Sequence, residues 1–169
     1  MAMLRAVAIG LAALLVWTMA GSRVASQQRL PLGSIVPGAV ETLPFGCTFF
    51  TLEPFDPFCP GLHIHTGIDL AAPLGTPVMA AADGIVVAVA HTSVGYGNYV
   101  MIAHGGGVIT LYAHLLETDV GTGDKVARGK KIGLEGSSGL STGPHVHFEV
   151  RINDQVVDPM RFLTPATPP

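Results

Sequence analysis

Charged residues are scarce in this sequence of 169 residues. Lysine and arginine together number 9, aspartate and glutamate number 12, and the formal net charge is −3. Without a basic surface, the composition gives no electrostatic support for a nucleic-acid partner. Glycine and proline are instead abundant, with 21 and 13 residues, and no stretch after residue 21 keeps a helical period for three turns. The composition excludes a helical bundle and predicts a turn-rich β protein.

The sequence has a single long hydrophobic run, and it lies at the N-terminus. Residues 6–21 are mostly apolar and follow a short positively charged start, which is typical of a signal peptide over residues 1–22. The run is short for a transmembrane helix, which needs about 20 residues, but an uncleaved anchor that tethers the chain to a membrane stays open. We expect the domain to be exported, to the periplasm, the cell wall or the extracellular medium.

Cysteine is rare, and the two residues present are Cys47 and Cys59. In an exported chain this pair favours a disulfide across a proline-rich loop. Thiols of a structural zinc site are usually closer in sequence, so that alternative fits less well. Residues 23–43 are polar and aperiodic and are predicted to be a linker. We expect one globular domain over residues 44–163 and a short tail over residues 164–169.

Short runs typical of β-strands, separated by glycine-containing turns, follow from residue 65 onward. The clearest are residues 78–80, 84–90, 98–104, 107–113, 131–134, 145–152 and 155–157. They predict a single all-β or β-dominated domain.

Polar and apolar residues alternate from residue 145 to residue 150, which is the period of a half-buried strand. His145, His147 and Glu149 would therefore share one face of the strand, while the residues between them pack into a core. Two imidazoles on one face, about 7 Å apart along the backbone, can lean toward a single small object. A strand face with three polar side chains packs poorly against a hydrophobic core and is well suited to a functional site.

His65 and Asp69 form a second candidate cluster. In a straight strand they would lie about 13 Å apart, but Gly67 between them allows a turn that brings both to one ion. A turn cap beside a surface histidine would explain this pair if it stood alone. Together with a second imidazole, the pair supplies three nitrogen and oxygen ligands, the number that a catalytic zinc site uses.

His114 ends an apolar run, where a lone histidine is usually a satisfied core residue. Beside a zinc ion it becomes a candidate acid or base. The other histidines are assigned turn or surface roles: His63, His91 and His104. The G-x-S-x-G pattern over residues 139–143 is followed by proline and a strand, so it does not fit a nucleophile elbow, and the helical H-E-x-x-H motif is absent.

Three motifs, in this order and spacing, resemble those of the lysostaphin/LytM-type zinc metallo-endopeptidases of bacterial cell walls. The motifs are His65-x-x-x-Asp69, Tyr112-x-His114-Leu115 and Gly143-Pro144-His145-x-His147-Phe148-Glu149. The likeness covers residues 65–163. Each motif alone is weak, but the set is specific.

The resemblance implies a compact antiparallel β-sheet with a zinc site in a groove. It implies that Zn²⁺ is bound by His65, Asp69 and His147, and that His114 and His145 are catalytic histidines that do not bind the metal. The implied reaction is hydrolysis of peptide cross-links in peptidoglycan, whose stem or bridge peptides would be the partner of a monomeric enzyme. Some members of the family place a tyrosine near the oxyanion, and none stands immediately upstream of His65.

Two other classes of protein fit parts of the sequence. The first is a non-catalytic zinc-binding module that binds wall peptides and activates another hydrolase; the presence of both His114 and His145 speaks against it. The second is a lipoyl- or biotinyl-type carrier, suggested by the glycine-rich run over residues 123–129. A carrier needs a modified lysine at a hairpin tip and leaves the clustered histidines unexplained.

Overall fold

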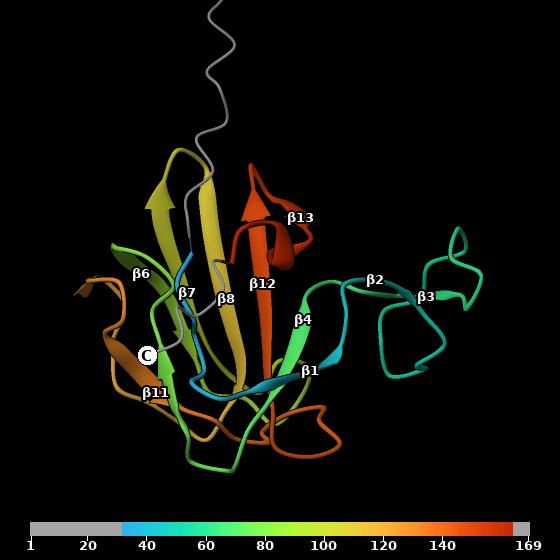
Figure 1. The fold of residues 1–169 in the computed structure, drawn as a ribbon, viewed down its shortest axis with the longest axis horizontal. Coiled ribbons are helices and arrows are strands. Elements are labelled where there is room, and N and C mark those ends of the chain that lie inside the picture. Colours follow the sequence, from blue (N-terminus) through green and yellow to red (C-terminus); the bar gives the residue numbers. More distant parts are fainter. Residues whose placement is uncertain (1–31, 164–169) are drawn as a thin grey trace, which may run out of the picture.

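The computed structural model describes residues 32–163, and these form antiparallel β-sheets with one short 3₁₀ helix, Pro159–Arg161 (Figure 1). The all-β class is therefore confirmed. The predicted leader over residues 1–22 and the tail over residues 164–169 lie outside the described residues. Within the described range, no helix is long and apolar enough to cross a membrane.

The largest sheet has eight strands and runs through the centre of the molecule. In spatial order it consists of β1 (Val40–Leu43), β4 (Ile68–Ala71), β12 (Val146–Ile152), β8 (Val108–Leu115), β7 (Asn98–Gly105), β6 (Gly84–Ala90) and β10 (Lys125–Val126), with β13 (Gln155–Val157) also paired to β12. A three-stranded sheet is formed by β5 (Pro77–Met79), β11 (Lys131–Leu134) and β9 (Glu117–Thr118). The strands that were predicted from the sequence lie within two residues of the expected runs.

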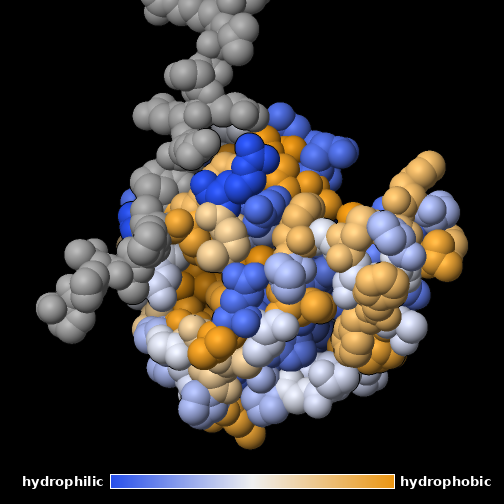
Figure 2. All heavy atoms as spheres, turned by 45° about the vertical axis from the view of Figure 1, so that its right-hand side comes forward, coloured by the Kyte–Doolittle hydropathy of each residue, from blue (hydrophilic) through white to orange (hydrophobic). Residues whose placement is uncertain are grey.

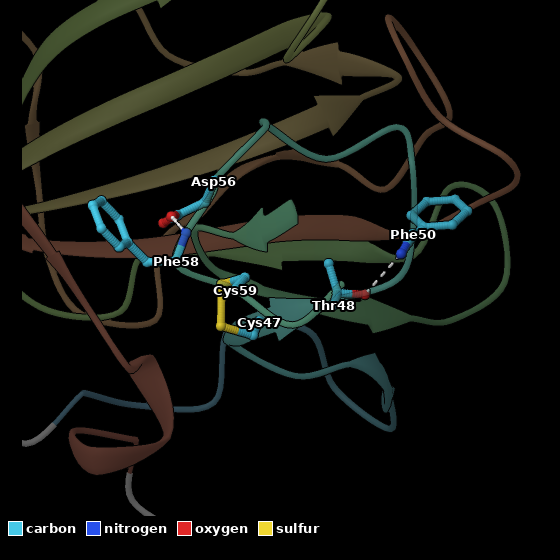
Figure 3. Close-up of a disulfide and its surroundings, with 6 residues drawn as sticks. All are labelled: Cys47, Thr48, Phe50, Asp56, Phe58 and Cys59. Atoms are coloured by element: carbon cyan, nitrogen blue, oxygen red, sulfur yellow. Dashed lines mark hydrogen bonds between the residues drawn. A yellow bond between two sulfur atoms is a disulfide. The ribbon is translucent and has the colours of Figure 1, made fainter. Parts of the chain in front are cut away.

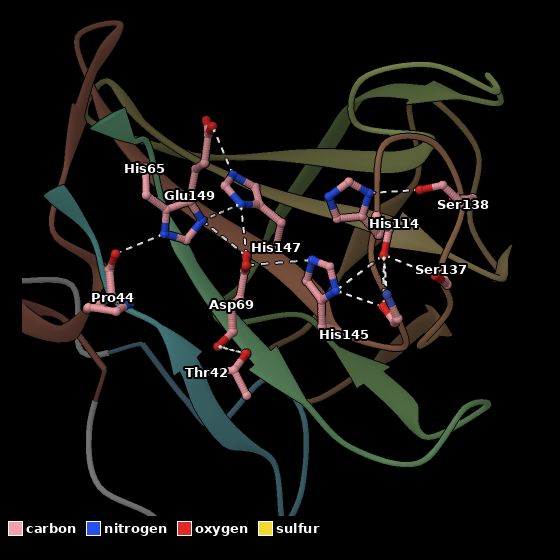
Figure 4. A network of polar contacts seen from close by, with 12 residues as sticks. Thr42, Pro44, His65, Asp69, His114, Ser137, Ser138, His145, His147 and Glu149 are labelled. Atoms are coloured by element: carbon pink, nitrogen blue, oxygen red, sulfur yellow. Dashed lines mark hydrogen bonds and ion pairs between the residues drawn. The ribbon is translucent and has the colours of Figure 1, made fainter. Parts of the chain in front are cut away.

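The alternation predicted for the strand after Pro144 is present in β12. Val146, Phe148 and Val150 are each 0% exposed and belong to the hydrophobic core. His147 and Glu149 point to the opposite face, toward β3 and the loops above the sheet (Figure 4). Apolar side chains on one face of β12 therefore hold the polar side chains of the other face in place.

The domain begins earlier than the sequence predicted. Leu32, Ile35 and Val36 are buried in the core, and β1 pairs with β4. The linker predicted over residues 23–43 is thus wrong for its second half, and residues 23–31 lie outside the described range. These apolar residues are irregularly spaced among prolines and glycines, so no period reveals them; they are buried through contacts with distant segments, such as the bond from the Leu32 amide to the Phe162 carbonyl (2.9 Å).

A separate hairpin projects from one side of the large sheet (Figure 1). It consists of β2 (Gly46–Thr48), β3 (His63–His65) and the connection between them, and residues 46–64 are called the arm below. A disulfide joins Cys47 to Cys59 and closes the connection, as predicted (Figure 3). The arm exposes the aromatic side chains of Phe49, Phe55 and Phe58. Figure 2 shows hydrophobic side chains on the part of the molecule that projects at the right of the view.

Gly67 connects β3 to β4 at a point where two segments of backbone nearly touch. A Cβ atom at this position would overlap the carbonyl oxygen of Phe148 in β12. Gly67 is not among the residues with positive φ, so the position needs a glycine because of this close approach and not because of a left-handed backbone.

We expect Gly67→Ala to lower the free energy of unfolding by about 1–3 kcal/mol, because the added methyl group must push β12 away from β4. The same shift would separate Asp69 from His147 and weaken metal binding. Gly121→Ala is the matched control, since a Cβ there meets nothing within 4 Å. Chemical denaturation and metal titration of both variants test this, and a Gly67→Ala protein as stable as Gly121→Ala would contradict it.

Candidate metal centre and active site

Three side chains from neighbouring strands meet at one point above the sheet (Figure 4). His65 Nε2 lies 3.1 Å from Asp69 Oδ1 and 2.9 Å from His147 Nδ1, and the last two atoms are 3.1 Å apart. The register explains the meeting: Asp69 in β4 pairs directly with His147 in β12. His65 is the last residue of β3. The tight connection through Gly67 to β4 brings its side chain next to Asp69.

The geometry of this triangle fits a divalent metal ion. Ligand atoms that share one tetrahedral zinc ion, at about 2.0–2.1 Å each, lie about 3.3–3.4 Å from one another. The three observed separations are slightly shorter than this, and all three residues are buried. Two imidazole nitrogens and a carboxylate oxygen also form a donor set that zinc accepts. The structure therefore forms a metal-binding group from the three residues predicted to be ligands.

Hydrogen bonds on the far sides of the two imidazoles select their tautomers. The Nδ1–H of His65 donates to the carbonyl of Pro44 (2.9 Å), which leaves the Nε2 lone pair facing the triangle. In His147 the roles are reversed, because Nε2–H donates to Glu149 (3.2 Å) and Nδ1 faces the triangle. Each ring, when neutral, is thus oriented so that a nitrogen lone pair can bind the ion.

Glu149 is completely buried and lies at the centre of a polar network. Its carboxylate accepts hydrogen bonds from the hydroxyls of Thr66 and Tyr96 (2.6 Å each) and pairs with Arg151 (2.6 Å). Burial alone would raise the pKa of Glu149, but hydrogen bonds from His147, Thr66 and Tyr96 lower it to about 2. The network keeps an anion behind His147 and makes that ring a stronger ligand.

Asp69 and His147 are strongly coupled. Burial alone would raise the pKa of Asp69, but the close contacts of its carboxylate with the rings of His147 and His65 hold that pKa well below its usual value. Burial alone would lower the pKa of His147, but hydrogen bonds to Asp69 and Glu149 raise it to about 9. The site therefore favours an ionised carboxylate at Asp69.

His114 and His145 stand beside the triangle without belonging to it. Their ring centroids lie 4.8 Å apart, and His145 Nε2 is 3.7 Å from the second carboxylate oxygen of Asp69. The Nδ1 atoms of both rings lie within hydrogen-bonding distance of backbone carbonyls, those of Ser138 (2.8 Å) and Gly143 (2.9 Å). These contacts leave Nε2 of each ring available for a proton.

The backbone of His114 leaves the regular strand, with φ = 60°, a conformation that costs energy for a bulky residue. Its amide donates to the Tyr96 carbonyl (2.9 Å), which helps to hold this turn. Burial lowers the pKa of His114 to about 4. His114 is therefore a neutral imidazole near pH 7.

The structure brings all five predicted site residues together. Asp69, His114, His145 and His147 line a groove between the sheet and the arm, and His65 is fully buried behind it. A hollow of about 290 Å³ continues from the triangle and is lined by Leu52, Glu53, Pro54, Thr66, Gly95, Tyr96, His114, Leu140 and His147. The remaining histidines lie outside it: His63 bonds to the Glu53 carbonyl, His104 bonds to the Asp83 carbonyl and Thr110, and His91 is exposed.

Sequence reasoning missed several residues of the site. Arg151 extends the alternation of His147 and Glu149 by one step, so that pattern could have identified it. Thr66 and Tyr96 come from other segments, and no local pattern indicates that their hydroxyls reach Glu149. Tyr96 lies in a glycine-rich stretch that also resembles the family, but sequence reasoning assigned it no role. Its hydroxyl donates a hydrogen bond to Glu149, so this tyrosine stands behind the metal ligand.

Comparisons with known proteins agree with the geometry. The model of peptidase family M23 matches residues 63–159. DD-carboxypeptidase/endopeptidase Mpg of Neisseria meningitidis is 52% identical over 109 residues, covering 63% of this chain and 25% of that protein. The chain thus spans about a quarter of the length of the first curated relatives that it matches.

Solved structures show the same fold. The catalytic domain of the antimicrobial peptidase lysostaphin from Staphylococcus simulans is 32% identical, with a TM-score of 0.60 over 73% of this chain and 91% of that chain. A point mutant of the catalytic domain of the M23 protein EnpA from Enterococcus faecalis is 37% identical, with a TM-score of 0.65 over 77% of this chain and 95% of that chain. With its three motifs, its sheet and its metal-binding group all in agreement, the chain belongs to peptidase family M23.

Proposed function

We propose that this protein is a zinc-dependent endopeptidase that hydrolyses peptide cross-links of bacterial peptidoglycan. The observation that carries the proposal is the pair His114 and His145, which lies beside the metal-binding group but outside it. A purely structural metal site has no need of two further imidazoles with free nitrogens. The relatives named as DD-carboxypeptidase/endopeptidase and as the antimicrobial peptidase lysostaphin support the same class of reaction.

The catalytic roles follow from the free nitrogen atoms. A zinc ion held by His65, Asp69 and His147 would lower the pKa of a water molecule and polarise the scissile carbonyl group. The Nε2 atoms of His114 and His145 are free to accept the proton of the attacking water and to pass it to the leaving amine. A protonated ring at either position can also donate a hydrogen bond to the oxyanion that develops on the substrate.

Export is a further part of the proposal. The N-terminal run supports it, and so does the Cys47–Cys59 disulfide, since such bonds persist in oxidising compartments. The alternative of a non-catalytic module that activates another hydrolase is less favoured. Such a module would have no use for His114, whose strained backbone and low pKa are maintained at the edge of the groove.

We expect residues 29–169, incubated with purified peptidoglycan, to release new peptide ends that mass spectrometry can identify. A chelator should abolish the release and added zinc should restore it. His114→Ala and His145→Ala should each lower turnover by about 100-fold or more, because each removes a group positioned for proton transfer, while zinc stays bound. His91→Ala, at an exposed position, is the control. A zinc-loaded protein that cleaves no type of peptidoglycan would favour the non-catalytic module.

Zinc binding should depend on pH through His147. Below its raised pKa of about 9, this ring carries a proton that zinc must displace, so binding at pH 7 should release about one proton and become about tenfold tighter per pH unit. Activity and zinc affinity should therefore fall together as the pH falls below about 9. Calorimetric titrations in buffers of different ionisation enthalpy measure the released proton, and equal heats in all buffers would contradict the prediction.

A further inference from the structure

One carboxylate in the groove takes no part in the metal-binding group or in the network around Glu149. Glu53 lies on the arm, is half-buried, and lines both hollows of the groove together with His147. Among the described residues, its carboxylate has no hydrogen bond and no ion pair, whereas the carboxylates of Asp69 and Glu149 have several each. It is also absent from the metal-binding group.

The backbone holds Glu53 firmly at this place. Its amide donates to the Phe50 carbonyl (3.1 Å), and its carbonyl accepts a hydrogen bond from Nδ1 of His63 (2.7 Å). The next residue is also fixed, because the carbonyl of Pro54 accepts from the amide of Ile64 in β3 (3.0 Å). These bonds and the disulfide hold Glu53 against β3, the strand that carries His65. The role of His63 is to fix the backbone of Glu53.

The charges that surround Glu53 are those of the site itself. Burial raises its pKa, and the groups that act on it electrostatically are His65, His147, Asp69 and His145. No lysine or arginine is among them, and Arg151 is already paired with Glu149. When these histidines are neutral, none of the groups that act on Glu53 in the described part of the chain is a cation.

We propose that Glu53 is the recognition group for a cationic amine of the substrate. The neighbouring walls support this assignment, because Leu52, Pro54 and Leu140 line the same hollow and can pack against the alkyl chain that carries an amine. The inference rests on the proposed function. Peptidoglycan stem peptides contain a diamino acid, and its side-chain amine is protonated at neutral pH wherever it is not part of a cross-link.

The test is a binding experiment on the zinc-loaded full chain, so that it does not depend on hydrolysis. The probes are a synthetic, uncrosslinked stem peptide with a free side-chain amine and the same peptide acetylated on that amine. We expect the free-amine peptide to bind about tenfold more tightly than the acetylated one, since a charge-assisted hydrogen bond is lost on acetylation. Glu53→Gln should remove this preference by weakening binding of the free-amine peptide alone.

Glu117→Gln is the matched control, because Glu117 is exposed and does not line the groove; it should keep the full preference. Zinc stoichiometry and the melting temperature establish that each variant is folded and loaded. Equal binding of both probes to the native protein, or binding of neither, would overturn the proposal. So would an equal loss for both probes in Glu53→Gln.

An equal gain for both probes in Glu53→Gln would also overturn it and would identify Glu53 as a self-inhibitory group instead. The proposed function has a separate readout, since it fails only if the zinc-loaded protein releases no peptide ends from peptidoglycan. An amine preference without hydrolysis would therefore support the role of Glu53 and reject the peptidase, and hydrolysis without an amine preference would do the reverse.

Discussion

The pairing of β4 with β12 is the constraint on which the site depends. It sets Asp69 directly opposite His147. On the other side of β12, His147 lies opposite Ala113 in β8, the residue before His114. A slip of one residue in this register would turn His147 into the core and Phe148 toward the groove. The burial of Val146, Phe148 and Val150 opposes such a slip, so packing on one face of the strand sets the chemistry on the other.

A second layer of interactions decides what the imidazoles can do. Each of the four histidines in the groove has one ring nitrogen close to an acceptor: carbonyl groups for His65, His114 and His145, and a carboxylate for His147. Since a neutral imidazole has one donor and one acceptor nitrogen, the opposite nitrogen of each ring keeps its lone pair. Position then separates the four rings: His65 and His147 meet at Asp69 in the metal-binding group, and His114 and His145 stand beside it.

Much of this arrangement could be predicted from the sequence because it depends on the spacing of residues that are close together in the chain. The alternation in β12 reveals which side chains share a face, and the short spacing of His65 and Asp69 around Gly67 reveals a turn. Other features depend on contacts between distant segments and have no local signal. Leu32 looks like a linker residue until the core that covers it is known, and Tyr96 becomes part of the site only through Glu149. The arm lies in a proline-rich loop whose sequence reveals a disulfide but not its proximity to the groove.

The two walls of the groove differ in how tightly they are held: the sheet is fixed by strand pairing and core packing, and the arm by fewer contacts. The metal-binding group and the two histidines beside it lie on β3, β4, β8 and β12 or next to these strands, so a shift of one strand alters several of these groups together. The arm is held by a disulfide and a few backbone hydrogen bonds, and its exposed aromatic residues make few demands on the core. Under the proposed function, substitutions in the arm are therefore expected to change which peptide binds in the groove without disturbing the metal-binding group. Because the arm continues directly into His65 at the end of β3, a substitution that shifts the backbone of the arm must still leave His65 in place. The hydrogen bond between His63 and the Glu53 carbonyl links the proposed recognition group to the same strand.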